Sequence, residues 1–355
     1  MRFLVTCDLH IKEENLQVGR ELLDSIEKTA FREACPIIIL IGDVWDEKHI
    51  PPFKVLMAIR NAILRWCSLN LQVIWIRGNH EVGIKSKPEE SYIKLFEGID
   101  YRLQIVNTPT TRVFDDVCLW MLPWYPPEEF KHYANEFKIQ TKQAMWARSK
   151  ILLSHIGLSG AQTSPSNVYT LNSKTSIHDL YANHYDYVLL GDIHITQYLA
   201  NNTLYCGCPI QLTFGDKPNQ GLYVLDCSLG GGILTNVPLE GQGNFPQYKT
   251  FEILYEHQFY TLTEPDHNYV KLKVDVNLMG AAHQVLKQKH NRRWSVEPLP
   301  LAKIKESKGR MVNIKENETE KILDLWLDSK GFTDTQIFKE VGLKYMINTG
   351  LFHKK

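Results

Sequence analysis

The chain has 355 residues, of which 44% are hydrophobic and 23% are charged, and this composition is typical of ordinary globular proteins. Its 40 basic and 40 acidic residues give a formal net charge of zero, so any binding to nucleic acid needs a local basic patch. The apolar run before Asp8 is too short for a signal peptide, and no run reaches the roughly 20 apolar residues of a membrane span. We therefore expect a cytoplasmic protein of two or three domains that does not bind a membrane.

The first half of the chain alternates short apolar runs with amphipathic stretches, which is the order typical of an α/β protein. Strands are predicted at 3–5, 37–41, 73–76, 117–122, 151–153, 187–190, 203–205 and 222–225. Helices are predicted at 16–34, 51–69 and 127–149. The run from Ile37 to Ile41 is continuously apolar, as in a central strand covered on both faces. Seven scattered cysteines, with no zinc-finger spacing among them, favour a reducing compartment.

A domain boundary is expected near one of two glycine clusters, Gly230-Gly231-Gly232 or Gly241-Gln242-Gly243, and we place it after Gly243. Residues 244–315 have 12 basic against 7 acidic residues and read as a small α+β capping domain that binds DNA. Within it a strand is predicted at 269–276, a helix at 281–290 and a strand at 294–296. Residues 316–355 form a predicted helical segment, whose amphipathic stretch at 319–327 either binds a partner or packs on its own domain.

Five polar clusters follow apolar strand-like runs in the first 194 residues. They are Asp8-Leu9-His10, Gly42-Asp43, Gly78-Asn79-His80-Glu81, Ser154-His155 and Gly191-Asp192-Ile193-His194. Each cluster is weak alone, because an aspartate after a strand is often only a helix cap. Five in order are harder to explain in that way, since open α/β sheets build their sites in the loops that leave the carboxyl ends of the strands.

The residue types in these clusters suit a pair of metal ions. Asp8 and His10 point the same way if the segment is extended, and the two oxygens of Asp43 allow it to bridge two ions. Mixed carboxylate, imidazole and amide donors favour Mn²⁺, with Mg²⁺ or Fe²⁺ as alternatives. A site with two such ions hydrolyses phosphate esters.

The ordered clusters resemble the signature of the calcineurin-like metallophosphoesterases. Within that superfamily the chain looks like the SbcD and Mre-eleven nuclease subunits and their phage counterparts. Three further segments carry this resemblance, namely Gly42-Asp43-Val44-Trp45-Asp46 before Pro51-Pro52, Pro123-Trp124, and Tyr205-Cys206-Gly207-Cys208-Pro209 leading to Phe214-Gly215-Asp216. The resemblance implies a two-sheet α/β sandwich, a homodimer within a heterotetramer, and an SMC-like ATPase partner of the SbcC kind.

The resemblance also implies roles for single residues. One metal would be held by Asp8, His10, Asp43 and His194, and the other by Asp43, Asn79, His155 and Asp192. His80 would not be a ligand; it would donate a proton to the leaving oxygen or stabilise the transition state. Asp192 departs from the pattern, because the family usually has histidine there. Either it ligates with an added negative charge or it is displaced and the second site is weaker.

The sequence predicts the substrate less clearly than it predicts the metal site. Candidate DNA contacts are Arg77, Lys85 and Lys87 beside the third cluster, and Lys289, Arg292 and Arg293 in the densest basic run. Each is equally an ordinary surface charge or a basic helix end. The function we expect is a two-metal DNA nuclease in end processing, repair or recombination. The alternatives are a metallophosphoesterase acting on nucleotides or phosphoproteins, and a non-catalytic scaffold with a relic fold.

Overall fold

The computed structural model describes residues 1–83, 90–163, 170–218, 220–228, 230–255, 257–262, 264, 268–289 and 293–299, with only the backbone of 260–261 and 288–289. The chain divides into two compact units, Met1–Phe245 and Pro246–Lys355. The division falls two residues beyond the boundary expected after Gly243. Gly230–Gly232 lies instead within the first unit, between two paired antiparallel strands.

The first unit contains two six-stranded sheets. The first sheet has the order β12-β11-β1-β2-β3-β4, in which β1 to β4 are parallel to one another. Its strands are β1 (Arg2–Thr6), β2 (Ile37–Ile41), β3 (Gln72–Ile76), β4 (Leu103–Val106), β11 (Leu222–Asp226) and β12 (Ile233–Val237). The second sheet has the order β5-β6-β7-β8-β10-β9, with β6, β7, β8 and β10 parallel. Its strands are β5 (Thr110–Phe114), β6 (Val117–Leu122), β7 (Ser149–His155), β8 (Tyr187–Gly191), β9 (Gln197–Ala200) and β10 (Thr203–Tyr205).

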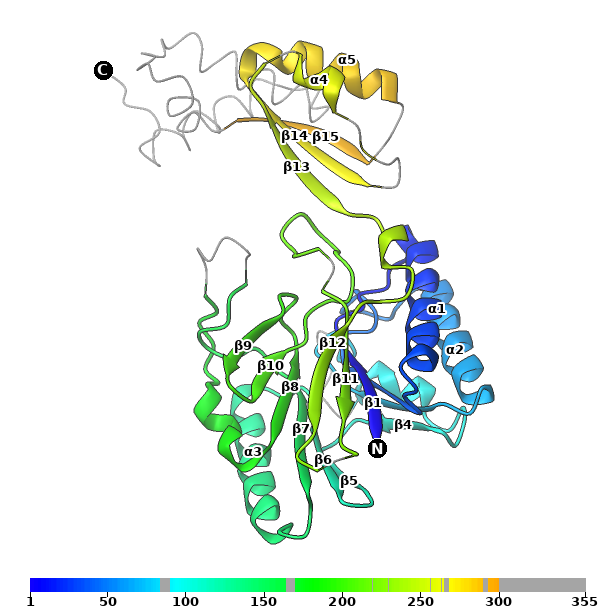
Figure 1. Cartoon of the computed structure of the whole chain (residues 1–355), viewed down its shortest axis with the longest axis vertical. Coiled ribbons are helices and arrows are strands. Elements are labelled where there is room, and N and C mark those ends of the chain that lie inside the picture. The colour runs from blue at the N-terminus through cyan, green and yellow to red at the C-terminus, as the bar shows by residue number, and fades with distance from the viewer. Residues whose placement is uncertain are drawn as a thin grey trace, which may run out of the picture. The chain divides into compact units, whose positions relative to one another are not determined.

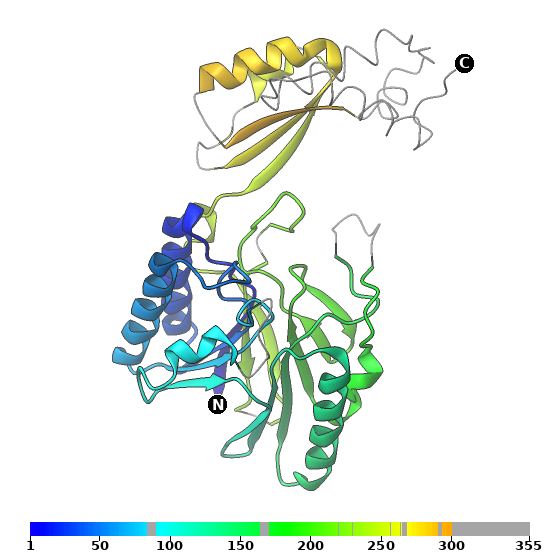
Figure 2. The ribbon, with the colours of Figure 1, turned by 180° about the vertical axis from the view of Figure 1, so that it is seen from behind.

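Helices cover the outer face of each sheet. Figures 1 and 2 show α1 (Leu16–Arg32) and α2 (Phe53–Ser68), in blue, beside the first sheet, and α3 (Pro127–Gln143), in green, beside the second. Apolar side chains fill three layers, which lie between α1, α2 and the first sheet, between the two sheets, and between the second sheet and α3. Alternate residues of β2 point into the first two layers, which explains its continuous apolar run. The predicted α/β sandwich is confirmed.

Short 3-10 turns occupy several of the connections. They are η1 (Glu13–Asn15), η3 (Tyr92–Phe96), η4 (Ile177–Leu180), η5 (Ala182–His184), η6 (Gln242–Asn244) and η7 (Val276–Leu278). The sequence reading missed β4, β5, β9 and β12. Three of these, β5, β9 and β12, are partly exposed and together with β4 form the sheet edges, so their sequences lack a continuous apolar signal.

The second unit has a three-stranded sheet of β13 (Tyr248–Ile253), β14 (Tyr269–Val274) and β15 (Trp294–Pro298), joined by α4 (Gln258–Thr261) and α5 (Met279–Lys289). All of its strand pairs are parallel, because a helix lies in each connection. Val270, Leu272 and Val274 pack with residues of α4 and α5 in its core. The predicted helical segment 316–355, with its stretch at 319–327, lies outside the described residues. Among the helices that the structure describes, none is both long enough and apolar enough to cross a membrane.

Candidate metal centre

The five polar clusters meet because the parallel strands before them end at the same edge. Asp8 and His10 follow β1, Asp43 follows β2, and Asn79 follows β3. In the second sheet His155 ends β7, and Gly191 at the end of β8 is its partner in the strand pairing. The loops after β1 and β2 are also joined directly, because the His10 N–H donates to the carbonyl of Asp43 at 3.1 Å.

The backbone of these loops is strained where the candidate ligands lie. Asp8, His10, Asp43 and Asp192 have φ values of 52°, 45°, 53° and 89°, in the left-handed region that residues other than glycine rarely adopt. Such strain persists only where surrounding structure imposes it, and it is concentrated at functional sites. Gly191 is required by close packing, because a Cβ there would lie 2.5 Å from the carbonyl oxygen of Ile41.

His155 presents one nitrogen to a group of oxygen atoms. Its Nδ1 lies 2.7 Å from the carbonyl oxygen of Ile41, which fixes Nδ1 as the donor. Its Nε2 then lies 3.2 Å from Asn79 Oδ1, 3.3 Å from Asp43 Oδ1 and 3.7 Å from Asp192 Oδ1. The four residues expected to hold one metal are therefore together, and Asp192 lies with the other three.

The four residues expected to hold the other metal are also brought together. His10 and His194 face each other with 3.0 Å between their Nε2 atoms. His10 Nε2 lies 3.8 Å from Asp43 Oδ2 and 4.0 Å from Asp8 Oδ1. Ligand atoms of Asp8, His10 and His194 lie within 4.8 Å of one another, as do those of Asp8, Asp43 and His155. Asp43 thus lies against the other expected ligands of both metals, which is the position that a bridging carboxylate needs.

The centre is electrostatically incomplete without cations. The pKa of Asp192 is raised to about 6, mainly by burial and also by the neighbouring charges of Asp43 and Asp8, against the opposing effect of His155. Burial would also raise the pKa of Asp43, but His155, His10 and His80 together lower it. Burial alone would lower the pKa of His155, yet the surrounding carboxylates raise it well above its ordinary value. The oxygens of Asn79, Asp43 and Asp192 around His155 Nε2 thus favour a positive charge beside it, so the donor set fits two divalent cations.

A comparison with known families agrees with this geometry. Residues 1–196 match the family model described as calcineurin-like phosphoesterase. The chain belongs to this family. Members of the family are metal-dependent phosphoester hydrolases, and the candidate ligand groups here are those that such a hydrolase needs. The identity of the metal is a separate question.

Several solved structures resemble this phosphoesterase. One is GAP50, the anchor in the inner membrane complex of Plasmodium, with 13% identity, a TM-score of 0.46, and coverage of 68% of this chain and 85% of that one. Another is a dimetal phosphatase from Danio rerio, with 8% identity, a TM-score of 0.46, and coverage of 67% and 99%. A third is the nuclease MPE of Pseudomonas putida, with 13% identity, a TM-score of 0.29, and coverage of 65% and 87%. At these TM-scores the likenesses carry no argument about substrate.

His80 lies at the edge of the phosphoesterase site. Its backbone N–H donates to Asp43 Oδ1 at 3.0 Å, and its Nε2 lies 3.6 Å from Asp43 Oδ2. Its Nδ1 bonds to the backbone carbonyl of Asp46, so Nε2 is the nitrogen turned toward the site. Burial is the main cause that lowers the pKa of His80, which makes its imidazolium a stronger acid.

Three carboxylates that the sequence reading left without a role position these residues. Asp46 Oδ1 lies 3.0 Å from His10 Nδ1, and Asp216 Oδ1 lies 3.5 Å from His194 Nδ1. Glu81 is fully buried and accepts backbone N–H groups of Gly78, Asp43 and Val44 at 2.7, 2.9 and 2.8 Å. Glu81 thereby joins the loops after β2 and β3. Partners of this kind orient metal ligands and are needed for affinity.

The structure does not bring the expected DNA contacts together as it does the metal ligands. Arg77 is fully buried, and its guanidinium donates to Asn107 and to the carbonyl of Trp124, so the prediction that it contacts DNA is wrong. Arg293 lies in the second unit with its guanidinium 5.2 Å from the ring centre of Tyr269. Lys289 is described only as the last backbone position of α5. Lys85, Lys87 and Arg292 lie outside the described residues.

Proposed function

We propose that this phosphoesterase is a two-metal DNA nuclease that hydrolyses phosphodiester bonds as an exonuclease, an endonuclease or both. The observation that supports it most is the convergence of seven side chains with oxygen or nitrogen donors, of which Asp43 lies against both groups of metal ligands. When bound, two divalent cations, Mn²⁺ by preference, supply Lewis acidity to a phosphoryl group and lower the pKa of water. The chain's own residues then have separable tasks.

The protein residues hold and orient the reacting groups. The backbone N–H of His80 fixes Asp43, and the carbonyl of Asp46 turns His80 Nε2 toward the site. We propose that His80, in its imidazolium form, delivers the proton on Nε2 to the departing sugar oxygen and keeps the Nδ1 proton that bonds to the carbonyl of Asp46. Asp192 adds a carboxylate where the family usually has histidine. The metal site formed by Asp43, Asn79, His155 and Asp192 therefore favours a harder cation.

Two features support DNA as the substrate over other phosphate esters. The first is the resemblance to the SbcD and Mre-eleven nucleases, which is carried by residues 42–52, by Pro123-Trp124 and by the segment from Tyr205 to Asp216. The second is the excess of basic residues at 244–315, which includes Lys271, Lys273 and Arg293 of the second unit. DNA binding of this kind depends on local positive charge, so we expect it to weaken with rising salt.

The substrate is tested by offering several phosphate esters to the full chain with Mn²⁺. End-labelled linear duplex DNA, a cyclic nucleotide and a phosphopeptide are compared at equal enzyme concentration, with the Asp43→Ala variant as the control for a contaminating enzyme. The proposal expects DNA cleavage that the variant lacks. Hydrolysis of the cyclic nucleotide or phosphopeptide without DNA cleavage would establish the alternative, a phosphoesterase for small substrates or phosphoproteins.

We further propose that the chain works as a homodimer with an SMC-like ATPase of the SbcC kind in DNA end processing, repair or recombination. The amphipathic pattern at 319–327, with Ile322, Leu323 and Trp326 apolar, supports such a contact. Affinity purification of the full chain from its host should recover an ATPase, and a Leu323→Asp and Trp326→Asp double variant should lose it. Recovery of the same ATPase by the double variant would refute the contact.

A further inference from the structure

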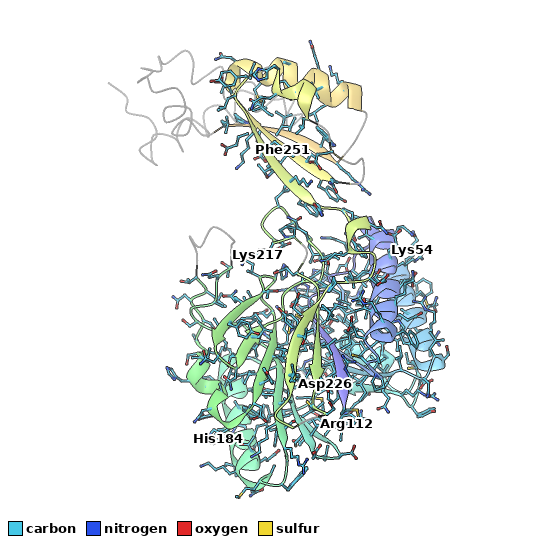
Figure 3. The ribbon with its side chains drawn as sticks, viewed as in Figure 1. Lys54, Arg112, His184, Lys217, Asp226 and Phe251 are labelled. Carbon is cyan, nitrogen blue, oxygen red and sulfur yellow. The ribbon has the colours of Figure 1, made fainter. Side chains whose placement is uncertain are left out.

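We infer that the first unit carries a second, non-catalytic site that binds a phosphate group at the amino ends of β2, β3 and β4. A hollow of about 490 Å³ lies there, lined by residues that precede or begin these strands and by Arg112 of β5. Asp43 and Asn79 follow the opposite ends of β2 and β3, so about five residues, or roughly 16 Å, separate the two sites. Arg112 lies near the part of the first unit where the chain begins (Figure 3).

Arg112 is a partly buried cation with neutral partners. Its Nη1 donates to Gln104 Oε1 at 2.7 Å, its Nη2 donates to Gln72 Oε1 at 2.9 Å, and its guanidinium lies 4.3 Å from the ring centre of Phe114. Across the described part of the chain no carboxylate lies within 4.0 Å of its nitrogens. Burial lowers the pKa of Arg112, and no neighbouring charge opposes that effect. An anion bound in the hollow would stabilise this partly buried cation, because it would supply the negative charge that its neighbours lack.

Arg102 supplies a second guanidinium to the same hollow. Asn70 Oδ1 accepts from its Nε and Nη2 at 3.3 and 3.2 Å, and the guanidinium lies 4.2 Å from the ring centre of Tyr101. Its nearest described carboxylate is Asp100, which lies outside the lining at 3.9 Å. The lining thus carries two positive charges, three side-chain amides and no acidic residue.

This arrangement matches a phosphate group more closely than other anions. Guanidinium forks pair with phosphate oxygens through two parallel hydrogen bonds, and two forks satisfy a dianion. Gln72 and Gln104 also line the hollow, and an amide side chain carries a donor nitrogen as well as the oxygen that Arg112 uses. Tyr101 is 83% exposed, and a nucleobase would stack on the face of its ring that Arg102 does not cover. Inorganic phosphate, a nucleoside monophosphate and a DNA backbone share this chemistry.

The site is tested by calorimetry on the full chain after removal of divalent metals. Inorganic phosphate, deoxyadenosine monophosphate and a short oligothymidylate are titrated separately, so that the tightest of the three identifies the source of the phosphate. The metal-free centre is rich in carboxylates and repels all three probes. The basic second unit also attracts the oligothymidylate, so binding at the hollow is the part of the affinity that Arg102→Gln and Arg112→Gln remove. Arg102→Gln and Arg112→Gln should each weaken binding by about tenfold or more. The control, Arg148→Gln, removes an exposed arginine outside the hollow and should bind as the wild type does.

Arg112 joins the two sheets through Gln72 and Gln104, so a thermal melt accompanies each variant. Arg102 lies at the rim and bonds one side chain, so its variant tests the proposal even if Arg112→Gln unfolds. Absence of saturable binding by all three probes would overturn the inference, as would unchanged affinity in a folded Arg102→Gln variant. Neither outcome bears on the proposed nuclease activity, because no metal or hydrolysis enters the experiment.

Discussion

Asp46 holds two histidines of the metal centre through two different groups, and these can be separated by mutation. Its carboxylate lies 3.0 Å from His10 Nδ1, while its backbone carbonyl bonds to Nδ1 of His80. A side-chain substitution alters the first contact and keeps the second. Asp46→Asn retains an oxygen that accepts from His10 but loses the charge, and Asp46→Ala loses both.

The size of the effect follows from the contact with His10. That contact is the main cause that lowers the pKa of Asp46 from 3.8 to about 2, which corresponds to roughly 2 kcal/mol at about 1.4 kcal/mol per pKa unit. The side chain is 38% exposed, so screening by solvent reduces this to about 1 kcal/mol. Because the pKa is lowered, this stabilisation is present above pH 3.8 and is lost as the pH falls through about 2. Measurements at neutral pH therefore include the whole stabilisation from the contact between Asp46 and His10.

Loss of such a ligand-orienting partner weakens metal binding by about 10-fold to 100-fold. We expect the lower figure for Asp46→Asn and the higher for Asp46→Ala in manganese titrations, with kcat at saturating manganese unchanged because the contact to His80 remains. The control is Asp115→Asn, an exposed turn residue with a positive φ of 51° that asparagine tolerates. A fall in kcat at saturating manganese with unchanged metal affinity would refute this reasoning.

Four further predictions concern the centre itself. His80→Ala should keep its metal, as measured by elemental analysis, while turnover falls by about 10²-fold to 10⁴-fold; loss of metal would make His80 a ligand. Asp43→Ala should lose both metal and activity, and the assignment of Asp43 as the bridge is wrong if both are retained. Protonation of His155 already opposes manganese binding at higher pH, and a proton on Asp192 should steepen the fall in affinity below about pH 6 by up to about tenfold per pH unit; Asp192→Asn should lose this added steepness. In the metal-free protein the same raised pKa makes stability fall as the pH rises from 3.8 to about 6, and urea unfolding across that range measures it.

The candidate ligands could be predicted from the sequence because they follow buried strands. The run from Ile37 to Ile41 is apolar throughout, since one face packs on α1 and α2 and the other on the second sheet. An uninterrupted run marks the strand end clearly, so Asp43 was placed correctly at the edge. His155 and Asn79 were placed by the same argument, and the parallel strands bring them within 3.2 Å.

The positioning residues could not be predicted in this way, because their roles depend on contacts between distant loops. Glu81 follows His80 directly, but its carboxylate binds the backbone of residues 43 and 44, nearly forty positions earlier. For Arg77 the error was the reverse, because the sequence predicted a role that the side chain does not have. A cation beside the site looked like a phosphate contact, whereas its side chain turns inward to Asn107 and Trp124. Sequence gives charge and order along the chain, but not the direction of a side chain.

The central claim is that these side chains hold two divalent ions around Asp43. Anomalous X-ray scattering from crystals soaked in manganese tests it directly. The account predicts two peaks about 3.5–4 Å apart, one against His10 and His194, the other against Asn79 and His155, with Asp43 in contact with both. A single peak, or two peaks that do not share Asp43, would contradict it.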